Sequence, residues 1–470
     1  MIYTASDDGL VHLSKDGGNS WKNITPKGLS ESLVNAVEVS AHQPERVYIA
    51  ANRYKFNDHS PEFYVSENYG KSWKKISEGI PYGAFARVLR EDPIREHLLY
   101  AGTEKGIYIS FNGGTSWAPF QSNLPHVAIT DLLVKDQDLV VATQGRSFWI
   151  LDGLELLRNY SEVPTTELYP VAPEIIGNWQ SSMSGSLEDF TGMQDFTGVN
   201  PANGAVLYYK LPNNLSDAPI SLTVRDASGA LVNQFSSEKD STYVEYEGAP
   251  SAAKILPKNK GLNRFVWTLD HAQLPGIPSA YIEASYRGHR VVPGTYTATL
   301  KVGEQVYIQE IKLKDNPNYG LSTAAYKEYD SFMEAAENTY TQMALLVNRL
   351  YKVSGQLEAL LIKTQDFTAT AAIKKLHAET TAWDALMIQR KSKAYDDVEN
   401  FPNKFTAEYL YVINQSHSDI PRINQGTKER IEVLNAQWES LHTTAKSLLE
   451  EKLPALNALL WKSGMGALNE

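Results

Sequence analysis

Three carboxylates in the first part of the chain are candidates for acid–base chemistry, namely Asp8, Asp58 and Glu104. Cleavage of a glycosidic bond uses two carboxyl groups about 5 to 10 Å apart, with the pKa of one raised so that it stays protonated. These residues are therefore candidate catalytic groups. The alternative interpretation is structural, because a run such as Asp7-Asp8-Gly9 also forms a good tight turn.

Seven further side chains are candidates for binding a ligand. A ligand site combines apolar or aromatic surface with a few well-placed polar groups, and this set contains both. The alternative for each residue is turn formation and solvation, and Arg146 could instead satisfy buried carbonyl groups. The candidates are Asp7, Arg53, Tyr54, Lys55, His59, Gln144 and Arg146.

Three nearly identical stretches organise the segments that carry these candidates. Each reads Ser-x-Asp/Asn-x-Gly-x-Ser-Trp, and they begin at residues 14, 66 and 110. A spacing near 50 residues is typical of a repeated supersecondary unit. The repeated positions are Ser14, Asp16, Gly18, Trp21, Ser66, Asn68, Gly70, Trp73, Ser110, Asn112, Gly114 and Trp117.

The repeated stretch predicts a hairpin turn. The side-chain oxygen of Asp16, Asn68 or Asn112 can accept a hydrogen bond from a backbone N–H two residues on, and the Gly that follows supplies the positive φ of a tight turn. Apolar alternation before each stretch predicts the strand that enters the turn. The closing Trp begins the next strand, with its ring packed beneath the hairpin. We therefore predict a structural role for these residues rather than chemistry.

The predicted fold class is mainly β plus α, in four regions. Residues 1–155 are predicted to form a partial β-propeller of about three to three and a half blades. A connector follows over 156–202, in which residues 168–171 are predicted to dock on the propeller. Short alternating strands over 203–315 predict an immunoglobulin-like or fibronectin-like β-sandwich. From 320 to 470 the apolar period becomes helical, which predicts a bundle of three or four antiparallel helices.

The chain resembles a family of large secreted bacterial proteins with Asp-box (BNR, or bacterial neuraminidase) and sortilin-type repeats, often labelled glycosyl hydrolases. The resemblance covers nearly the whole chain. It includes the three repeated stretches and the runs Arg53-Tyr54-Lys55, Gly145-Arg146-Ser147-Phe148-Trp149, Asn200-Pro201-Ala202-Asn203-Gly204 and Gly261-Leu262-Asn263-Arg264-Phe265-Val266-Trp267. Where such proteins often carry His before Gly-Arg-Ser-Phe-Trp, this chain has Gln144.

The resemblance has consequences for organisation and location. It implies export to an extracellular or periplasmic location, although no signal peptide follows Met1. It also implies upstream blades, or a partner chain, that complete the propeller. In such propellers the turns between the second and third strands lie opposite the Asp-box turns, and ligands usually bind on that face. All of the candidate site residues fall in these turns.

Composition excludes several other classes. The net charge of −11 argues against nucleic-acid and anionic-membrane partners, and no apolar run is long enough to span a membrane. The absence of Cys removes disulfides and thiolate chemistry. No Gly-x-Ser-x-Gly, His-Glu-x-x-His, Walker or EF-hand motif occurs. The ten His are scattered along the chain, so neither a metal site nor a cofactor is predicted.

The predicted function is binding of an extracellular glycan or polypeptide by the propeller loops, without proven catalysis. The alternative is a glycoside hydrolase, xyloglucanase-like or sialidase-like, with some catalytic carboxylates outside this chain. The sandwich and the helices would serve as a scaffold in either case.

Overall fold

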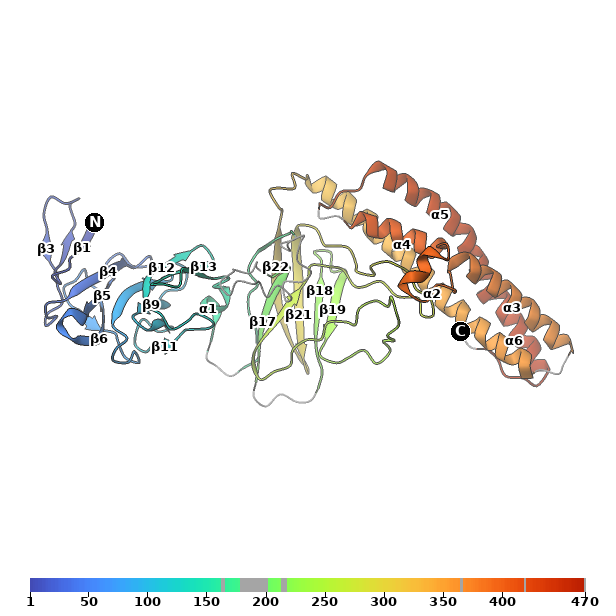
Figure 1. Ribbon diagram of the computed structural model, residues 1–470, viewed down its shortest axis with the longest axis horizontal. Coiled ribbons are helices and arrows are strands. Elements are labelled where there is room, and N and C mark those ends of the chain that lie inside the picture. The colour runs from blue at the N-terminus through green and yellow to red at the C-terminus, as the bar shows by residue number, and fades with distance from the viewer. Residues whose placement is uncertain (162–164, 178–201, 213–217, 364–366, 418–419, 469–470) are drawn as a thin grey trace. The chain divides into compact units, whose positions relative to one another are not determined.

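The computed structural model describes residues 1–161, 165–177, 202–212, 218–363, 367–417 and 420–468. The chain forms two compact units, Met1–Glu162 and Val163–Glu470, which we call unit 1 and unit 2. The expectation of a mixed β and α protein is confirmed (Figure 1). The predicted sandwich and helical regions lie within the single unit 2, and the four domain boundaries stay a prediction. Residues 178–201 of the predicted connector lie outside the described residues.

Unit 1 contains four small antiparallel sheets in which each strand pairs with the next one along the chain. The first sheet comprises β1 Ile2–Ala5, β2 Val11–Ser14 and β3 Lys22–Asn23; the second β4 Leu33–Val39, β5 Val47–Arg53, β6 Asp58–Ser66 and β7 Lys74–Lys75; the third β8 Ala86–Glu91, β9 Leu99–Thr103, β10 Gly106–Ser110 and β11 Ala118–Pro119; the fourth β12 Ile129–Lys135, β13 Asp138–Thr143 and β14 Phe148–Leu151. The short helix α1, Glu155–Asn159, follows the last strand.

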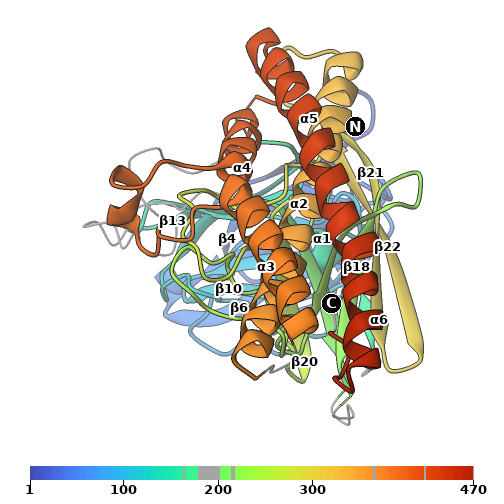
Figure 2. The ribbon, with the colours of Figure 1, turned by 90° about the vertical axis from the view of Figure 1, so that its right-hand side faces the viewer.

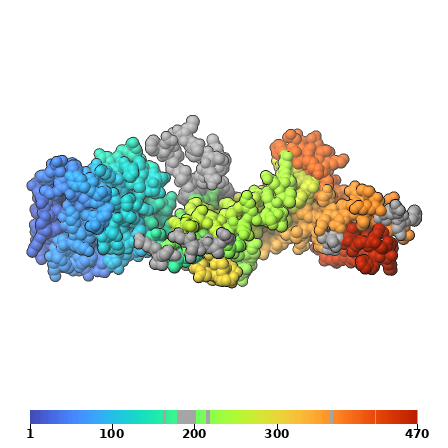
Figure 3. All heavy atoms as spheres, turned by 90° about the horizontal axis from the view of Figure 1, so that it is seen from below, coloured from blue at the N-terminus to red at the C-terminus, as the bar shows by residue number. Residues whose placement is uncertain are grey.

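Neighbouring sheets of unit 1 contact each other through their first strands, with β8 between β4 and β12. Arg90 on β8 links all three strands. Its guanidinium lies 3.4 Å from Glu38 on β4 and 2.7 Å from Asp131 on β12, and its Nε donates to the carbonyl of Leu132 at 2.8 Å. The apolar side chains between the sheets are buried. Figure 3 shows the outer surface of this part of the chain in blue to green. An ionic link therefore supplements the apolar packing of unit 1.

The three repeated turns have the same hydrogen bonds. In the third turn the Ser110 hydroxyl donates to Asn112 Oδ1 at 2.9 Å, and the backbone N–H groups of Gly114 and Ser116 donate to Ser110 Oγ and Asn112 Oδ1, both at 2.9 Å. The backbone donor lies four residues after Asn112, not two as predicted, because two residues of positive φ, Gly113 and Gly114, widen the turn. The Ser and Asn side chains of the turn are therefore hydrogen-bonded within their own loop.

The Trp that closes a repeated turn contacts the preceding sheet, not only the hairpin beneath it. The indole N–H of Trp73 donates to the carbonyl of Ile24 at 2.6 Å, and that of Trp117 to Ile76 at 2.6 Å. A Cβ on Gly70 would lie only 2.5 Å from the Ile24 side chain, so this position has no room for a larger residue. The repeat therefore joins consecutive sheets.

Unit 2 begins with two sheets that share one hydrophobic core. The smaller sheet has the order β15 Glu167–Leu168, β17 Ala205–Leu211, β20 Gly261–Trp267; the larger has the order β16 Glu174–Ile175, β22 Gln305–Lys314, β21 Gly294–Val302, β18 Ile220–Arg225, β19 Leu231–Ser236. Leu168 pairs with Tyr209 of β17, so the prediction that residues 168–171 dock on the first region is wrong. The immunoglobulin-like topology stays a prediction.

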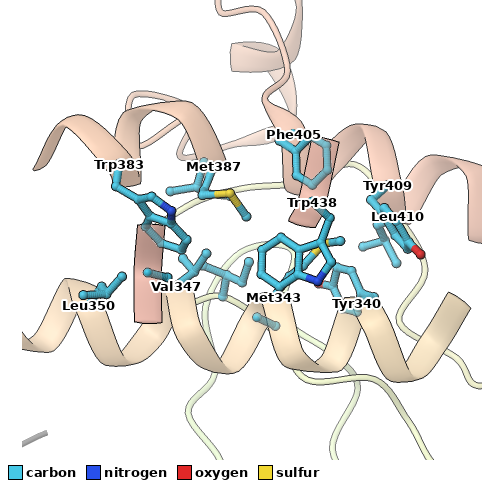
Figure 4. Packing of buried hydrophobic residues seen from close by; sticks show 14 of the residues in the cluster. Tyr340, Met343, Val347, Leu350, Trp383, Met387, Phe405, Tyr409, Leu410 and Trp438 are labelled. Atoms are coloured by element: carbon cyan, nitrogen blue, oxygen red, sulfur yellow. The ribbon is translucent and has the colours of Figure 1, made fainter. Parts of the chain in front are cut away.

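The C-terminal part of unit 2, from residue 323 onward, is mainly helical (Figure 2). The helices are α2 Thr323–Lys363, α3 Phe367–Met387, α4 Phe405–Ser416, α5 Gln425–Lys446 and α6 Leu453–Lys462, with a π-helical turn, Ser447–Lys452, between the last two. Trp383 and Trp438 meet the α2 side chains Met343 and Val347 in one buried cluster (Figure 4). Among the described residues, no helix is both long enough and apolar enough to cross a bilayer.

Candidate functional site

The predicted site residues lie at one end of the sheets of unit 1. A repeated turn joins β6 to β7 and β10 to β11, so the turns β5–β6 and β9–β10 lie at the opposite end of these antiparallel sheets. The turns β1–β2 and β13–β14 are their equivalents in the three-stranded sheets. We call this the loop end. Asp7 and Asp8 lie in the first turn, residues 53–59 in the second, Glu104 in the third, and Gln144 and Arg146 in the fourth.

Asp8 is bound up in its own turn. It accepts a hydrogen bond from the Ser6 hydroxyl and one from the backbone N–H of Leu10 at 3.3 Å. These two contacts lower the pKa of Asp8, with the Ser6 hydroxyl having the larger effect. Gly9 has φ +91°, and a Cβ there would meet the backbone of Ser32 at 3.0 Å. Asp8 is therefore placed as the acceptor of a tight turn.

The other two candidate carboxylates are paired with arginines. Arg53 Nη1 lies 2.8 Å from Asp58, whose other oxygen accepts the backbone N–H of Ser60 at 3.0 Å. Ser60, and to a smaller extent Arg53, lowers the pKa of Asp58. Glu104 contacts Arg87 through Nε at 2.7 Å and Nη2 at 2.5 Å. Within the described residues, no hydrogen bond joins any two of Asp8, Asp58 and Glu104.

An aromatic loop cluster lies beside these ion pairs, formed by Tyr54, Phe56, His59, Tyr82 and Phe85. Tyr54 stacks on the buried Phe85 with ring centroids 5.3 Å apart and planes 16° apart, and His59 meets Tyr82 edge to face at 6.0 Å. Tyr54, Phe56 and Tyr82 remain 41%, 50% and 64% exposed. The cluster therefore exposes apolar ring surface that a ligand could contact, and the buried Phe85 packs against the inner side of Tyr54.

Sequence reasoning missed part of this cluster. Phe56, Tyr82, Phe85 and Arg87 were not predicted, because Tyr82 and Phe85 lie in the loop between β7 and β8 and not in a turn within a sheet. The backbone N–H of Gly83 donates to the carbonyl of His59 at 2.9 Å, which brings the two loops together. The Pro81-Tyr82-Gly83 run was a usable turn signal.

The remaining candidates are exposed and contact mainly backbone. Lys55 and Asp7 are exposed. The backbone N–H of Gln144 donates to the carbonyl of Ala128 at 2.9 Å. Arg146 donates from Nη1 to the carbonyl of Gly145 at 2.9 Å, and its own carbonyl accepts the Trp149 indole N–H at 2.8 Å. The structure thus brings residues 53–59 together with Glu104 through neighbouring loops, but no hydrogen bond or ion pair of the described residues joins Arg146 to them.

A hollow of about 680 Å³ lies at the opposite end of unit 1, beside the repeated turns. Its lining includes Trp73, His97 and Glu96. Glu96 is already paired with the buried Arg46 at 2.9 Å, and the Trp73 indole N–H donates a hydrogen bond to the Ile24 carbonyl. These two polar groups of the hollow are therefore already engaged within unit 1.

Unit 2 contains a second group of side chains that sequence reasoning did not identify. We call His271, His289, Asp330, Glu337 and His417 the histidine cluster. His289 Nδ1 lies 2.8 Å from Glu337 Oε2, and its Nε2 lies 3.3 Å from Asp330 Oδ1. The His271 ring stacks on that of His289 with centroids 3.9 Å apart. Two of the ten scattered histidines therefore meet in space.

Burial and hydrogen bonding shift the protonation of this cluster strongly. Burial lowers the pKa of His271 to about 4. Burial also disfavours charge on His289, but hydrogen bonds with Asp330 and Glu337 outweigh it and raise the pKa of His289 to about 9. Burial disfavours charge on Glu337 too, but hydrogen bonds from His289 and His417 lower its pKa to about 2. The surroundings of the two neighbouring imidazoles therefore shift their pKa values in opposite directions.

Comparison with known proteins found no matching family model and no matching curated protein. Solved structures match at low similarity. They include YCF48 bound to D1 peptide, with 17% identity, 32% of this chain and 47% of that chain covered, and TM-score 0.26. The Niastella koreensis GH74 enzyme (12% identity, 66% and 43%, TM-score 0.26) and the GH74 xyloglucanase from Xanthomonas campestris (12%, 65% and 52%, TM-score 0.26) are also similar. The matched part spans about half the length of each of these proteins.

Proposed function

We propose that unit 1 is part of a β-propeller whose loop end binds an extracellular glycan and does not cleave it. The observation that carries the proposal is the aromatic loop cluster, in which three partly exposed rings lie next to paired charges. Sugar rings present C–H surfaces that pack on aromatic faces, while their hydroxyl groups reach the polar groups at the edge of the rings. The proposed export of the protein is supported by the family resemblance of the sequence.

The support behind the rings favours binding. The Tyr54 ring stacks on the ring of the buried Phe85. The guanidinium carbon of Arg87 also lies over the Phe85 ring, 5.3 Å from its centroid. Aromatic side chains with few rotatable bonds lose little conformational entropy on binding. Arg53 also lies over Phe56, at 5.8 Å. The cluster is therefore largely pre-organised for a ligand.

The carboxylates support binding more than hydrolysis. A glycosidase needs one carboxylic acid that remains protonated near neutral pH. The pKa values of Asp8 and Asp58 are lowered by their hydrogen bonds. Glu104 is engaged by two nitrogen atoms of Arg87. These groups are suited to hold the loops and to accept hydrogen bonds from sugar hydroxyls.

Affinity electrophoresis through a gel containing xyloglucan, and through a matched gel containing mannan, tests the proposal. We expect retardation of the protein in at least one gel. Tyr82→Ala should weaken binding by about 3- to 10-fold, the value of one ring contact. Trp21→Ala is the matched control, because Trp21 is 46% exposed but lies in a repeated turn, at the other end of the sheets.

Two results would decide against a glycan. Equal retardation of the Tyr82 and Trp21 variants would place binding elsewhere. A third gel contains gelatin, an extended polypeptide, in place of the polysaccharide. Retardation in this gel alone would show that the loop end binds an extended polypeptide.

A further inference from the structure

We propose that His271, His289 and Asp330 bind a divalent transition-metal ion, and that Zn²⁺ matches the site best. One ligand atom from each residue lies within 4.8 Å of the other two. Imidazole nitrogens and a carboxylate oxygen are common zinc ligands, and three protein ligands leave a fourth tetrahedral position open. This inference concerns unit 2 and does not depend on the function proposed for unit 1.

The backbone sets the two histidines side by side. Residues 269–271 and 289–291 form an antiparallel pair, in which the His271 N–H donates to the His289 carbonyl and the Val291 N–H donates to the Leu269 carbonyl, at 2.9 and 2.8 Å. Directly opposite residues in such a pair project from the same face. A Cβ on Gly288 would lie 2.4 Å from the carbonyl oxygen of Ala272, so the close approach requires glycine. The backbone pairing of these two segments therefore places the two imidazole rings next to each other.

Glu337 orients His289 for a metal. One carboxylate oxygen lies 2.8 Å from His289 Nδ1, and the other accepts the His289 backbone N–H at 2.8 Å. His417 Nε2 lies 3.4 Å from the same carboxylate. A carboxylate on Nδ1 is the usual outer partner of a metal-binding histidine, because it fixes the ring and leaves Nε2 as the ligand atom. The His289 side chain is 1% exposed, so its orientation is fixed.

Asp330 completes the set from helix α2. It lies two helical turns before Glu337, so both carboxylates lie on the same face of the helix. Two ligands of one tetrahedral zinc ion lie about 3.3 Å apart. Asp330 Oδ1 lies 3.3 Å from His289 Nε2 and 4.0 Å from His271 Nε2. Asp330 is 36% and His271 24% exposed, and metal binding requires their two ligand atoms to move from 4.0 Å to about 3.3 Å apart.

A cavity lies beside His271, one of the three proposed ligands. His271 lines a cavity of about 620 Å³ together with Asp270, Arg287 and Arg290. Asp270 is 6% exposed, and its Oδ1 lies 3.7 Å from Arg287 Nε. The cavity would give a metal ion a path from solvent to His271, which a metal site with an open coordination position requires.

The test is titration of the full chain, freed of metal with a chelator, with Zn²⁺ alone by calorimetry. We expect one zinc ion per chain, and at least a 100-fold loss of affinity in His271→Ala and in Asp330→Asn. Co²⁺ in place of Zn²⁺ should give a visible absorption of tetrahedral character that both variants abolish. His377→Ala and Glu334→Gln, on α3 and α2 but outside the cluster, are matched controls and should change the affinity less than 2-fold.

The variants also separate the metal from a purely ionic role. Folding of each variant is checked by circular dichroism and by thermal unfolding with chelator present, and His271→Ala is the safest because His271 is the more exposed ring. If the wild-type chain binds no zinc, or if both cluster variants bind zinc as well as the controls do, the proposal is wrong. The cluster is then an ion-paired link between the strands and α2.

Discussion

The loop end of unit 1 and the histidine cluster of unit 2 contain the same kinds of side chain in opposite settings. At the loop end the charges are partly exposed and paired by near neighbours, as Arg53 is with Asp58. In the histidine cluster His289 and Glu337 are almost completely buried and come from segments far apart in the chain. The comparison indicates that a binding surface made of neighbouring residues can be predicted from residue types alone. A buried cluster such as His289 with Glu337 depends on how segments far apart in the sequence fold together.

The largest expected effect is on the buried cluster. Glu337→Ala removes the partner of His289 Nδ1, of the His289 backbone N–H and of His417, so we expect unit 2 to lose about 3 to 5 kcal/mol of unfolding free energy. Hydrogen exchange of α2 under metal-free conditions measures this. Glu334→Ala on the exposed side of the same helix should change stability by less than about 0.5 kcal/mol. Similar losses in both variants would contradict the assigned role of Glu337.

Arg90 is the corresponding link in unit 1, and its side chain is partly buried, at 22% exposed. Arg90→Ala removes the ion pairs with Glu38 and Asp131 and the hydrogen bond to the Leu132 carbonyl, and we expect a loss of about 1 to 2 kcal/mol in unit 1. Hydrogen exchange should rise in β4, β8 and β12 together. Arg87→Ala, which breaks a single ion pair at the loop end, should cost less than about 1 kcal/mol. If Arg90→Ala and Arg87→Ala lower the unfolding free energy equally, the claim that the contacts between the sheets matter more for stability than the loop-end pair is wrong.

The same interior makes unit 1 sensitive to pH. Burial raises the pKa of Glu38 from 4.5 to about 7, with Arg90 opposing the effect only in part. The folded state therefore binds a proton between pH 4.5 and 7 that the unfolded state releases, so stability should fall as pH rises through this range, by about 2 kcal/mol. Denaturant unfolding at pH 5 and pH 7 measures the slope. Glu38→Gln should flatten it, and an unchanged slope would assign it to another group.

The repeated turns should show the smallest of these effects. Asn112→Ala removes the acceptor for the Ser116 N–H and the Ser110 hydroxyl, and we expect a loss of about 1 kcal/mol. Asn112→Asp keeps the acceptor, as Asp16 does in the first turn. Chemical unfolding of the two variants therefore tests a structural role. Equal destabilisation by Ala and Asp would show that the amide N–H₂, bound to Ser116 at 2.9 Å, matters more than the acceptor.

Local features of the fold were predictable from sequence. Strand β1 and the turns were predicted because alternation and the Asp/Asn-x-Gly spacing are local properties. The helical stripe through Leu350, Val353 and Leu357 is buried, because a period near 3.6 specifies one face of α2. The pairing of β15 with β17 was not predicted, because two extended residues do not specify their partner.

The histidine cluster could not be found in the same way. It depends on the register of residues 269–271 against 289–291, which have no alternating pattern long enough to predict a strand. Its usable signals were Gly288 directly before a histidine and the seven-residue spacing of Asp330 and Glu337. At the loop end the turns were predicted correctly, but Tyr82 was missed because the contact to His59 joins two separate loops.

The most direct test of the account is the chain length of a polysaccharide before and after incubation with the protein. A soluble polysaccharide that the protein retains in the affinity gel is incubated with an excess of protein, and its size and reducing ends are measured. The account predicts binding with no change in size and no new reducing ends, because the loop-end carboxylates are held by hydrogen bonds and arginines. New reducing ends that disappear in Glu104→Gln would contradict it and show that the loop end is a hydrolase site.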